Sequence, residues 1–253
     1  MGDLHADFIA AGADIVITNT YSTTAQRFDE YVAGDRLEEI VGRAIAQAHR
    51  ARDEAARPVL IAGSLPPFRG SYLADRVADY EVLVPGYEAA ATLLAPHVDF
   101  LICETMTTLD EARAARDGAA AATDLPIWVA WTLQNHPPTA LTNGTSFADA
   151  VAAVDADAYL INCTEPETVE AALPLLVAAT DKPVGVYANA FDNLPPAWSL
   201  QSGDSLPPRR EDFGSEAFTS HALACVEADA RIIGGCCWIG PDKIAHLHAA
   251  LGD

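Results

Sequence analysis

Three cysteines stand where two apolar segments of this chain end. Cys163 lies in Ile161-Asn162-Cys163-Thr164, and Cys236 and Cys237 follow Ile232-Ile233-Gly234-Gly235. Thiolates are good ligands of zinc, and three of them leave a tetrahedral Zn²⁺ ion one open position, which catalytic zinc sites keep and structural sites fill. The residue types and their places in the chain predict a metal centre built from these three side chains.

The alternative is that these thiols are small buried residues, since free cysteine is commonly buried. Adjacent residues of a regular strand point to opposite faces, so Cys236 and Cys237 can share a metal only if the chain turns there. The Gly234-Gly235 pair makes such a turn easy. A vicinal pair with a third thiol at another strand end favours metal binding. Cys103 and Cys225 fall inside a predicted strand and helix, and we expect them in the core.

The composition narrows the class of protein. Half of the 253 residues are hydrophobic, enough for a substantial core. The formal net charge of -21, from 36 acidic and 15 basic residues, disfavours nucleic-acid binding and indicates an acidic surface suited to high salt. No apolar run is long enough to cross a membrane, and the first residues lack the regions of a signal peptide, so we expect a cytoplasmic protein. Five cysteines, an odd number, suit metal or thiol chemistry better than disulfides.

Helices and apolar strands alternate along the whole chain. Continuously apolar strands are expected where both faces of a parallel sheet are covered. Seven strands, each followed by a helix, plus one helix before the first strand, predict an α/β fold: a TIM-type (β/α)8 barrel that lacks its first strand. A doubly wound sheet is the alternative, but no Gly-x-Gly-x-x-Gly turn follows a strand. The predicted strands are 14–19, 59–63, 98–104, 127–131, 158–162, 184–187 and 231–234, and the predicted helices are 3–12, 35–55, 81–95, 109–122, 146–154, 166–179, 213–228 and 241–251.

The longer polar or Pro-rich segments all follow strands. They are residues 64–80, 134–145 and 191–212. In a barrel such loops emerge at the face where the strands end, which is where active sites lie. Residues 191–212 are long enough to form a lid, although a surface loop of this length is equally compatible with the sequence.

The cysteine motifs and several strand ends resemble the homocysteine S-methyltransferases, the family that includes betaine- and S-methylmethionine-dependent enzymes. The resemblance rests on Asn162-Cys163, on Gly234-Gly235-Cys236-Cys237, and on the segments 11–21, 62–67 and 100–105. It implies that Cys163, Cys236 and Cys237 hold Zn²⁺ and that the sulfur of homocysteine takes the fourth position. It also implies a sulfonium or ammonium methyl donor, such as S-methylmethionine, S-adenosylmethionine or betaine, and methionine as the product.

The same resemblance assigns substrate-binding residues. Glu104 matches an acidic residue that clamps the homocysteine ammonium, and Thr105 follows it in the motif. Tyr21 matches an aromatic residue near the donor, where a ring face favours a cation. Asn19 and Asn162 are expected to orient ligands or backbone. Homocysteine and the methyl donor are the expected partners, and the sequence is compatible with a homo-oligomer.

The chain departs from the family at its start. The family's first strand carries an Asp-Gly-Gly-type turn that helps to bind the amino acid, and residues 1–13 contain no counterpart. We therefore expect residues 1–253 to form one barrel domain, N-terminally truncated relative to the family. An upstream start codon, a strand supplied from elsewhere, or a defective paralogue would each account for this.

Two other functions compete with a zinc-dependent methyltransferase. One is a zinc- or thiol-binding barrel without catalysis. The other is a metal-free barrel lyase, which would need a Schiff-base lysine or a phosphate-binding loop. Neither of the two lysines, Lys182 and Lys243, lies at the C-terminal end of a predicted strand. The seven histidines offer no metal-binding pattern.

Overall fold

In the computed structural model, seven parallel strands form one curved sheet. The structure describes residues 2–24, 36–133, 140–192, 194, 198 and 205–252. The strands follow one another in chain order across the sheet, and each pairs in parallel with the next. They are β1 (Ile15–Ile17), β2 (Leu60–Leu65), β3 (Phe100–Met106), β4 (Ile127–Trp131), β5 (Ala158–Asn162), β6 (Val184–Ala188) and β7 (Ile232–Gly235).

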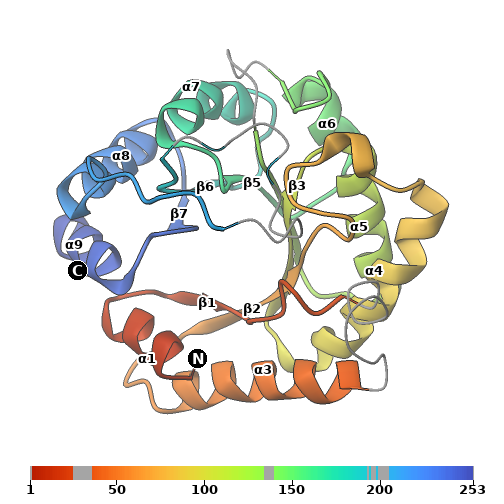
Figure 1. Cartoon of the computed structure of the whole chain (residues 1–253), viewed down its shortest axis with the longest axis horizontal. Coiled ribbons are helices and arrows are strands. Elements are labelled where there is room, and N and C mark those ends of the chain that lie inside the picture. The colour runs from red at the N-terminus through yellow and green to blue at the C-terminus, as the bar shows by residue number, and fades with distance from the viewer. Residues whose placement is uncertain are drawn as a thin grey trace.

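Helices surround this sheet as an outer layer, so that the chain forms a ring in the view of Figure 1. Two of the predicted helices, 109–122 and 241–251, have the observed bounds, and the described helices otherwise differ from prediction by a few residues at their ends. The helices are α1 (Gly2–Ala10), α3 (Leu37–Asp53), α4 (Tyr80–Leu94), α5 (Leu109–Ala122), α6 (Phe147–Ala153), α7 (Pro166–Val177), α8 (Ser215–Glu227) and α9 (Pro241–Leu251). The predicted barrel architecture is confirmed.

The core has two layers, as the continuously apolar strands predict. Side chains on the outer face of the sheet, such as Ile61, Leu101 and Val129, pack against the helices. Side chains on the inner face, such as Phe100 and Leu160, form a smaller cluster inside the ring. All seven residues of β3 are buried, which shows that both faces of the strand are covered.

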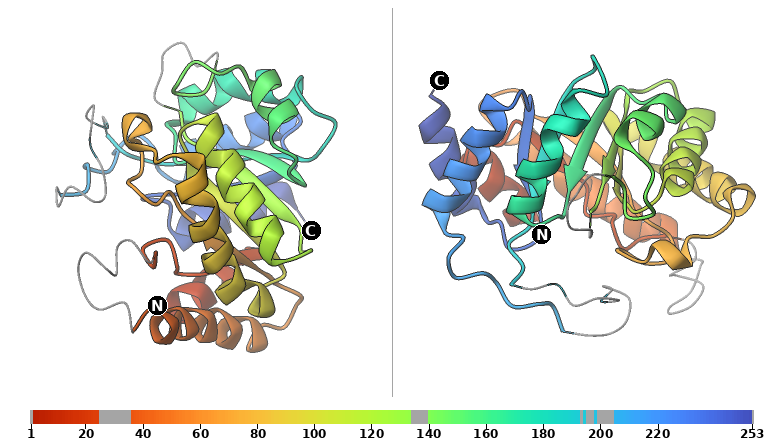
Figure 2. Two further views of the ribbon diagram at one scale, coloured as in Figure 1. Left: turned by 90° about the vertical axis from the view of Figure 1, so that its right-hand side faces the viewer. Right: turned by 90° about the horizontal axis from the view of Figure 1, so that it is seen from above.

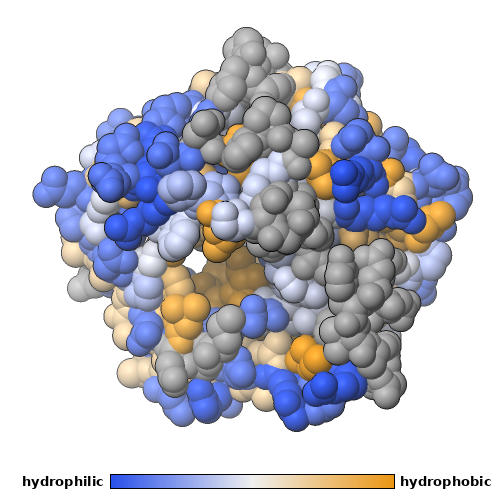
Figure 3. Space-filling model, viewed as in Figure 1, coloured by the Kyte–Doolittle hydropathy of each residue, from blue (hydrophilic) through white to orange (hydrophobic). Residues whose placement is uncertain are grey.

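Within the described residues, the sheet has its two edges at β1 and β7. Between these two edges the outer layer of helices is continuous, because α1 contacts α9. Gly12, which follows α1, lies so close to the imidazole of His248 in α9 that a Cβ on Gly12 would come within 2.4 Å of it. The face seen in Figure 1 is hollowed near the centre of the ring, with apolar residues in the hollow (Figure 3). A sheet one strand short of eight matches the prediction.

The connections that carry the candidate site lie on the side of the ring where the strands end. The segment 205–212, which returns toward α8, extends from that side in Figure 2. In the ranges given above, no helix is long and apolar enough to span a membrane.

Candidate metal centre

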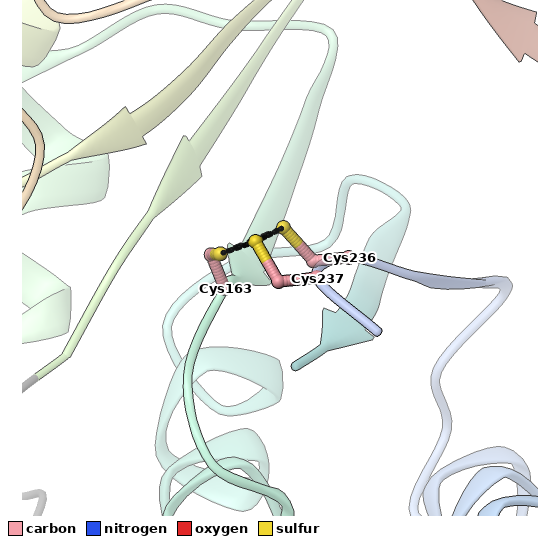
Figure 4. Close-up of side chains that lie close together, drawn as sticks. All are labelled: Cys163, Cys236 and Cys237. Atoms are coloured by element: carbon pink, nitrogen blue, oxygen red, sulfur yellow. Dashed lines mark hydrogen bonds between the residues drawn. The ribbon is translucent and has the colours of Figure 1, made fainter. Parts of the chain in front are cut away.

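The three predicted cysteine ligands meet at the rim where β5 and β7 end. Sγ of Cys163 lies 2.7 Å from Sγ of Cys236 and 3.6 Å from Sγ of Cys237, and the two vicinal sulfurs are 3.9 Å apart. The three side chains point toward one another from two separate segments (Figure 4). Among the described residues, no other group of three or more His, Cys, Asp or Glu side chains lies close enough to hold a metal ion.

The vicinal cysteines share this centre because the chain turns directly after β7. The amide of Ile239 donates to the carbonyl of Cys236 at 3.1 Å and closes a four-residue turn. Trp238, the third residue of the turn, has a φ of +64°, as type II turns require at that position. The turn replaces the alternation of a strand, so that Cys236 and Cys237 both face Cys163. The chain therefore turns here, as the sharing of one metal ion by Cys236 and Cys237 requires.

The two glycines before the turn matter because they have no side chain, and not because of their φ angles. The positive φ lies on Trp238, and neither Gly234 nor Gly235 has one. A Cβ on Gly235 would lie 2.1 Å from Cγ2 of Ile239, whereas a Cβ on Gly234 would lie 3.3 Å from its nearest neighbour. Gly235 is therefore the position where only a hydrogen fits.

Cys163 is turned into the ring by its own backbone, with a φ of +46° directly after β5. Its amide donates to the carbonyl of Tyr187 at 3.0 Å, and its carbonyl accepts from the hydroxyl of Thr132 at 3.2 Å. The hydroxyl of Tyr72 donates to Sγ of Cys163 at 2.8 Å. Cys163 is thus held at both its backbone and its sulfur.

The three thiols differ in their acidity. The hydrogen bonds from Cys236, Cys237 and Tyr72 hold the pKa of the Cys163 thiol well below its usual value, although burial acts in the opposite direction. The bonds to Cys163 raise the pKa of Cys236 and of Cys237. Cys163 is therefore the first of the three to become a thiolate, and a bound cation would stabilise the others in the same form.

Aromatic side chains cover the sulfurs. Tyr72, Phe191 and Trp198 are buried in one cluster with Cys163, with ring centroids 5.7 Å apart for Tyr72 and Trp198 and 5.6 Å apart for Phe191 and Trp198. Trp198 belongs to the segment 191–212, which the sequence leaves open as a lid or a surface loop. Residues 193, 195–197 and 199–204 of this segment lie outside the described part. Phe191 and Trp198 of this segment therefore lie against the candidate centre.

Glu104 lies inside the ring at the end of β3. Its carboxylate accepts hydrogen bonds from the hydroxyls of Ser64 at 2.5 Å and Tyr187 at 3.2 Å. Burial raises the pKa of Glu104 to about 7, against the two hydrogen bonds, which lower it. A carboxylate this easily protonated gains from a cationic partner, which makes Glu104 suited to holding an ammonium group.

Thr105 and Asn162 bind each other. The Asn162 side-chain oxygen accepts from the Thr105 amide at 2.9 Å, and its nitrogen donates to the Thr105 hydroxyl at 2.8 Å. Asn162 is fully buried and Thr105 is 2% exposed. Both polar atoms of the Asn162 side chain therefore have protein partners.

Tyr21 and Asn19, the two predicted substrate-binding residues that follow β1, differ in their surroundings. The hydroxyl of Tyr21, which is half-buried, lies 2.7 Å from that of Ser71. Asn19 is exposed, and its neighbours Thr18 and Thr20 make the buried hydrogen bonds that join β1 to Ser64. The structure places Tyr21, rather than Asn19, beside the segment that carries Tyr72.

Sequence reasoning did not single out Ser64, Tyr72 or Tyr187. Ser64 and Tyr187 lie near the ends of their strands, and Tyr72 lies in the rim segment 64–80. Their places in the chain were the available signal, since a polar side chain at the rim end of a barrel strand indicates the active site. Cys103 and Cys225 are buried in the core, as predicted.

The arrangement combines three sulfurs at one point, a buried carboxylate and an aromatic cover. Three thiolates could hold one soft metal ion with a ligand position left for a substrate. An acidic group inside the same ring could bind a cationic end of that substrate. The site therefore suits a small amino acid that carries a thiol.

Comparison with known proteins agrees with this chemistry. The sequence profile of the family described as homocysteine S-methyltransferase matches residues 1–251. The homocysteine S-methyltransferase of Escherichia coli is 30% identical over 98% of this chain and 83% of its own length, and that of Bacillus subtilis, YbgG, is 28% identical over 97% and 82%.

A solved structure is similar over the same range. The homocysteine methyltransferase MmuM from Escherichia coli, in a crystal structure described as the metallated form, superposes with a TM-score of 0.78 at 25% identity, covering 98% of this chain and 83% of that one. The agreement of profile, relatives and fold shows that the chain belongs to the homocysteine S-methyltransferase family and is a methyltransferase.

Proposed function

We propose that this protein transfers a methyl group from a sulfonium or ammonium donor to the thiol of homocysteine, giving methionine, with Zn²⁺ bound by Cys163, Cys236 and Cys237. The observation that carries the proposal is the convergence of these three sulfurs, none more than 3.9 Å from the next, at the rim of the ring. Family membership supports methyl transfer to homocysteine, and the presence of three thiolate ligands supports zinc as the metal.

Two groups of residues bind the two ends of homocysteine, its ammonium and its thiol. Glu104 holds the ammonium of homocysteine with its carboxylate, which Ser64 and Tyr187 keep in place. The three thiolates hold the metal, and Tyr72 fixes Cys163 among them. Bound zinc supplies one thing, stabilisation of the substrate thiol as a thiolate at neutral pH.

The aromatic cover supports a cationic methyl donor. A positive charge near ring faces is favoured, and exclusion of water strengthens its attraction to them. The hydroxyl of Tyr21 is hydrogen-bonded to Ser71, the residue before Tyr72, and Tyr21 is proposed to contact the methyl donor. S-methylmethionine, S-adenosylmethionine and betaine all carry a positive charge at the methyl-bearing atom, so each of them suits these aromatic residues.

The rival functions predict different behaviour. A metal-free lyase would need a free lysine at the rim. Nζ of Lys182 instead bonds Asp155 and the carbonyl of Ala156, and Nζ of Lys243, 3% exposed as a residue, bonds the carbonyl of Trp238. A barrel that only binds zinc would carry the metal without forming methionine.

Zinc content and product formation together test the proposal. The wild type is expected to bind one equivalent of zinc and to form methionine from homocysteine with at least one of the three donors. Cys236→Ser is expected to lose both. Cys225→Ser, which alters a buried cysteine in α8 away from the centre, is the matched control and should keep both. A wild type without zinc would overturn the metal assignment, and a zinc-loaded wild type without methionine would favour the binding protein.

A further inference from the structure

The same backbone conformation occurs twice at the rim, once in β3 and once directly after β5. In each case a residue that faces the inside of the ring is followed by a residue with positive φ. Glu104 is followed by Thr105 with a φ of +64°, and Asn162 is followed by Cys163 with a φ of +46°. The second residue of each pair would face outward in a regular strand, and the positive φ turns it.

The conformation of Thr105 is rare for its residue type. A β-branched side chain at positive φ is a steric outlier, because Cβ crowds the backbone. The pairing of β3 with β4 shifts at this point: Cys103 lies opposite Val129, but Met106 lies opposite Trp131, so β3 has one extra residue. Such a bulge allows two successive side chains, here those of Glu104 and Thr105, to lie on the same face of a sheet.

Two hydrogen bonds hold this bulge in place, and both come from Asn162. Its side chain reaches past the end of β4, accepts from the Thr105 amide at 2.9 Å and donates to the Thr105 hydroxyl at 2.8 Å. Neither residue is more than 2% exposed, so water does not compete for these bonds. We call this pair the Thr105–Asn162 clamp.

We propose that the Thr105–Asn162 clamp is a positioning device that fixes the Glu104 carboxylate relative to the Cys163 sulfur. The clamp joins the residue directly after Glu104 to the residue directly before Cys163. The inference rests on the proposed function, in which these two groups bind the ammonium and the thiol of one homocysteine molecule. A fixed separation between them selects a thiol that carries an ammonium at the matching distance.

Selectivity between two thiols tests the clamp. Homocysteine and 4-mercaptobutyrate differ only in the ammonium group. Asn162→Ala is expected to lower kcat/KM for homocysteine by about 10- to 100-fold, the usual loss of activity when a residue that supports a metal ligand is removed. The same variant should lower kcat/KM for 4-mercaptobutyrate by no more than about 3-fold, because that thiol does not use Glu104. Calorimetric binding of the two thiols to the zinc-loaded proteins should show the same change in selectivity, and zinc content should stay at the wild-type level.

A second variant tests whether Asn162 acts through the backbone of Thr105. Glycine adopts positive φ without steric cost. In a Thr105→Gly background, Asn162→Ala should therefore lower kcat/KM for homocysteine by no more than about 3-fold. Thr219→Val, which removes a part-buried hydrogen bond between Thr219 and His246 away from the site, should leave the selectivity unchanged.

Equal losses for the two thiols would overturn the clamp while leaving the proposed function intact. So would an Asn162→Ala loss that is the same with and without the Thr105→Gly substitution. An inactive or zinc-free wild type would instead overturn the proposed function and the role of the clamp with it. The two failures are distinguishable, since one is seen in the variants of an active enzyme and the other in the wild type.

Discussion

The hydroxyl of Tyr72 donates a hydrogen bond of 2.8 Å to the sulfur of Cys163. The same hydroxyl lies 3.3 Å from the carbonyl oxygen of Cys163, and Tyr72 is itself held at a φ of +69°. A side chain held in this way orients the sulfur and stabilises its thiolate form. Tyr72 is therefore the residue through which the rim segment 64–80 acts on the candidate metal centre.

Removal of this hydroxyl should weaken metal binding. Tyr72→Phe leaves the three cysteines and the aromatic packing in place, so we expect zinc affinity to fall by about 10- to 100-fold, as for other residues that orient metal ligands. Competition with a chromophoric chelator measures this affinity. Tyr80→Phe makes the same chemical change where the hydroxyl bonds Asp117 and serves as the control. Equal zinc affinities for Tyr72→Phe and the wild type would show that the hydrogen bond has no role in the centre.

The two glycines before the vicinal cysteines should differ in their tolerance of a methyl group. Gly235→Ala would place Cβ 2.1 Å from Ile239, within the turn that carries Cys236 and Cys237, whereas Gly234→Ala would meet its nearest neighbour at 3.3 Å. We expect Gly235→Ala to lose zinc and methyl transfer, and Gly234→Ala to keep its zinc. Metal analysis of the two purified variants checks this, and retention of full zinc by Gly235→Ala would show that the turn can adjust.

The sequence predicted the barrel because its strands are apolar without interruption. In α5 and in β4 and β5, the predicted and observed bounds coincide, since hydrophobic runs and polar breaks are sharp there. The first predicted strand, 14–19, is shorter in the structure, with Ile15–Ile17 in β1. This strand lies at an edge of the described sheet, where fewer neighbours extend the pairing.

The candidate site was predictable where residue type alone carries the chemistry, and not where contacts do. Three cysteines at strand ends indicate a metal centre. Nothing in the type of Tyr72 indicates that its hydroxyl meets a sulfur, because that contact joins segments 91 residues apart. The positive φ values of Thr105 and Trp238 also gave no signal, since residues of these types rarely adopt them.

The start of α5 depends on a buried carboxylate that has no proposed part in catalysis. Glu111 is 2% exposed and accepts hydrogen bonds from the amide and the hydroxyl of Thr107 at 2.9 and 3.0 Å, while Thr108 caps the helix. Glu111→Ala leaves a buried amide without its partner, so we expect the free energy of unfolding to fall by about 1–3 kcal/mol. Asp110→Ala, in the same turn but exposed, should change it by less than about 0.5 kcal/mol. Denaturant unfolding measures both, and similar values for the two variants would show that the bonds from Thr107 to Glu111 do not stabilise the start of α5.

The buried carboxylate of Glu104 should make both stability and substrate binding depend on pH, in opposite directions. Burial raises the pKa of Glu104 to about 7 in the folded protein, above its ordinary value of 4.5. Between these values the unfolded chain loses the proton and the folded chain keeps it, so stability is fully present below pH 4.5 and is lost as the pH rises through 7. Glu104→Gln should remove a loss on the order of 3 kcal/mol between about pH 4.5 and 8, measured as the difference from wild type in denaturant unfolding.

Homocysteine binding follows the opposite course, because the ammonium needs the ionised carboxylate. The KM for homocysteine should fall in the wild type as the pH rises through about 7, and this Glu104-dependent change should be absent in Glu104→Gln. Glu111→Gln is the matched control, since burial also raises the pKa of Glu111 to about 7. It should share the effect on stability but retain the wild-type change of KM with pH. If Glu104→Gln showed the same change of KM as the wild type, the ammonium would have to bind elsewhere in the ring.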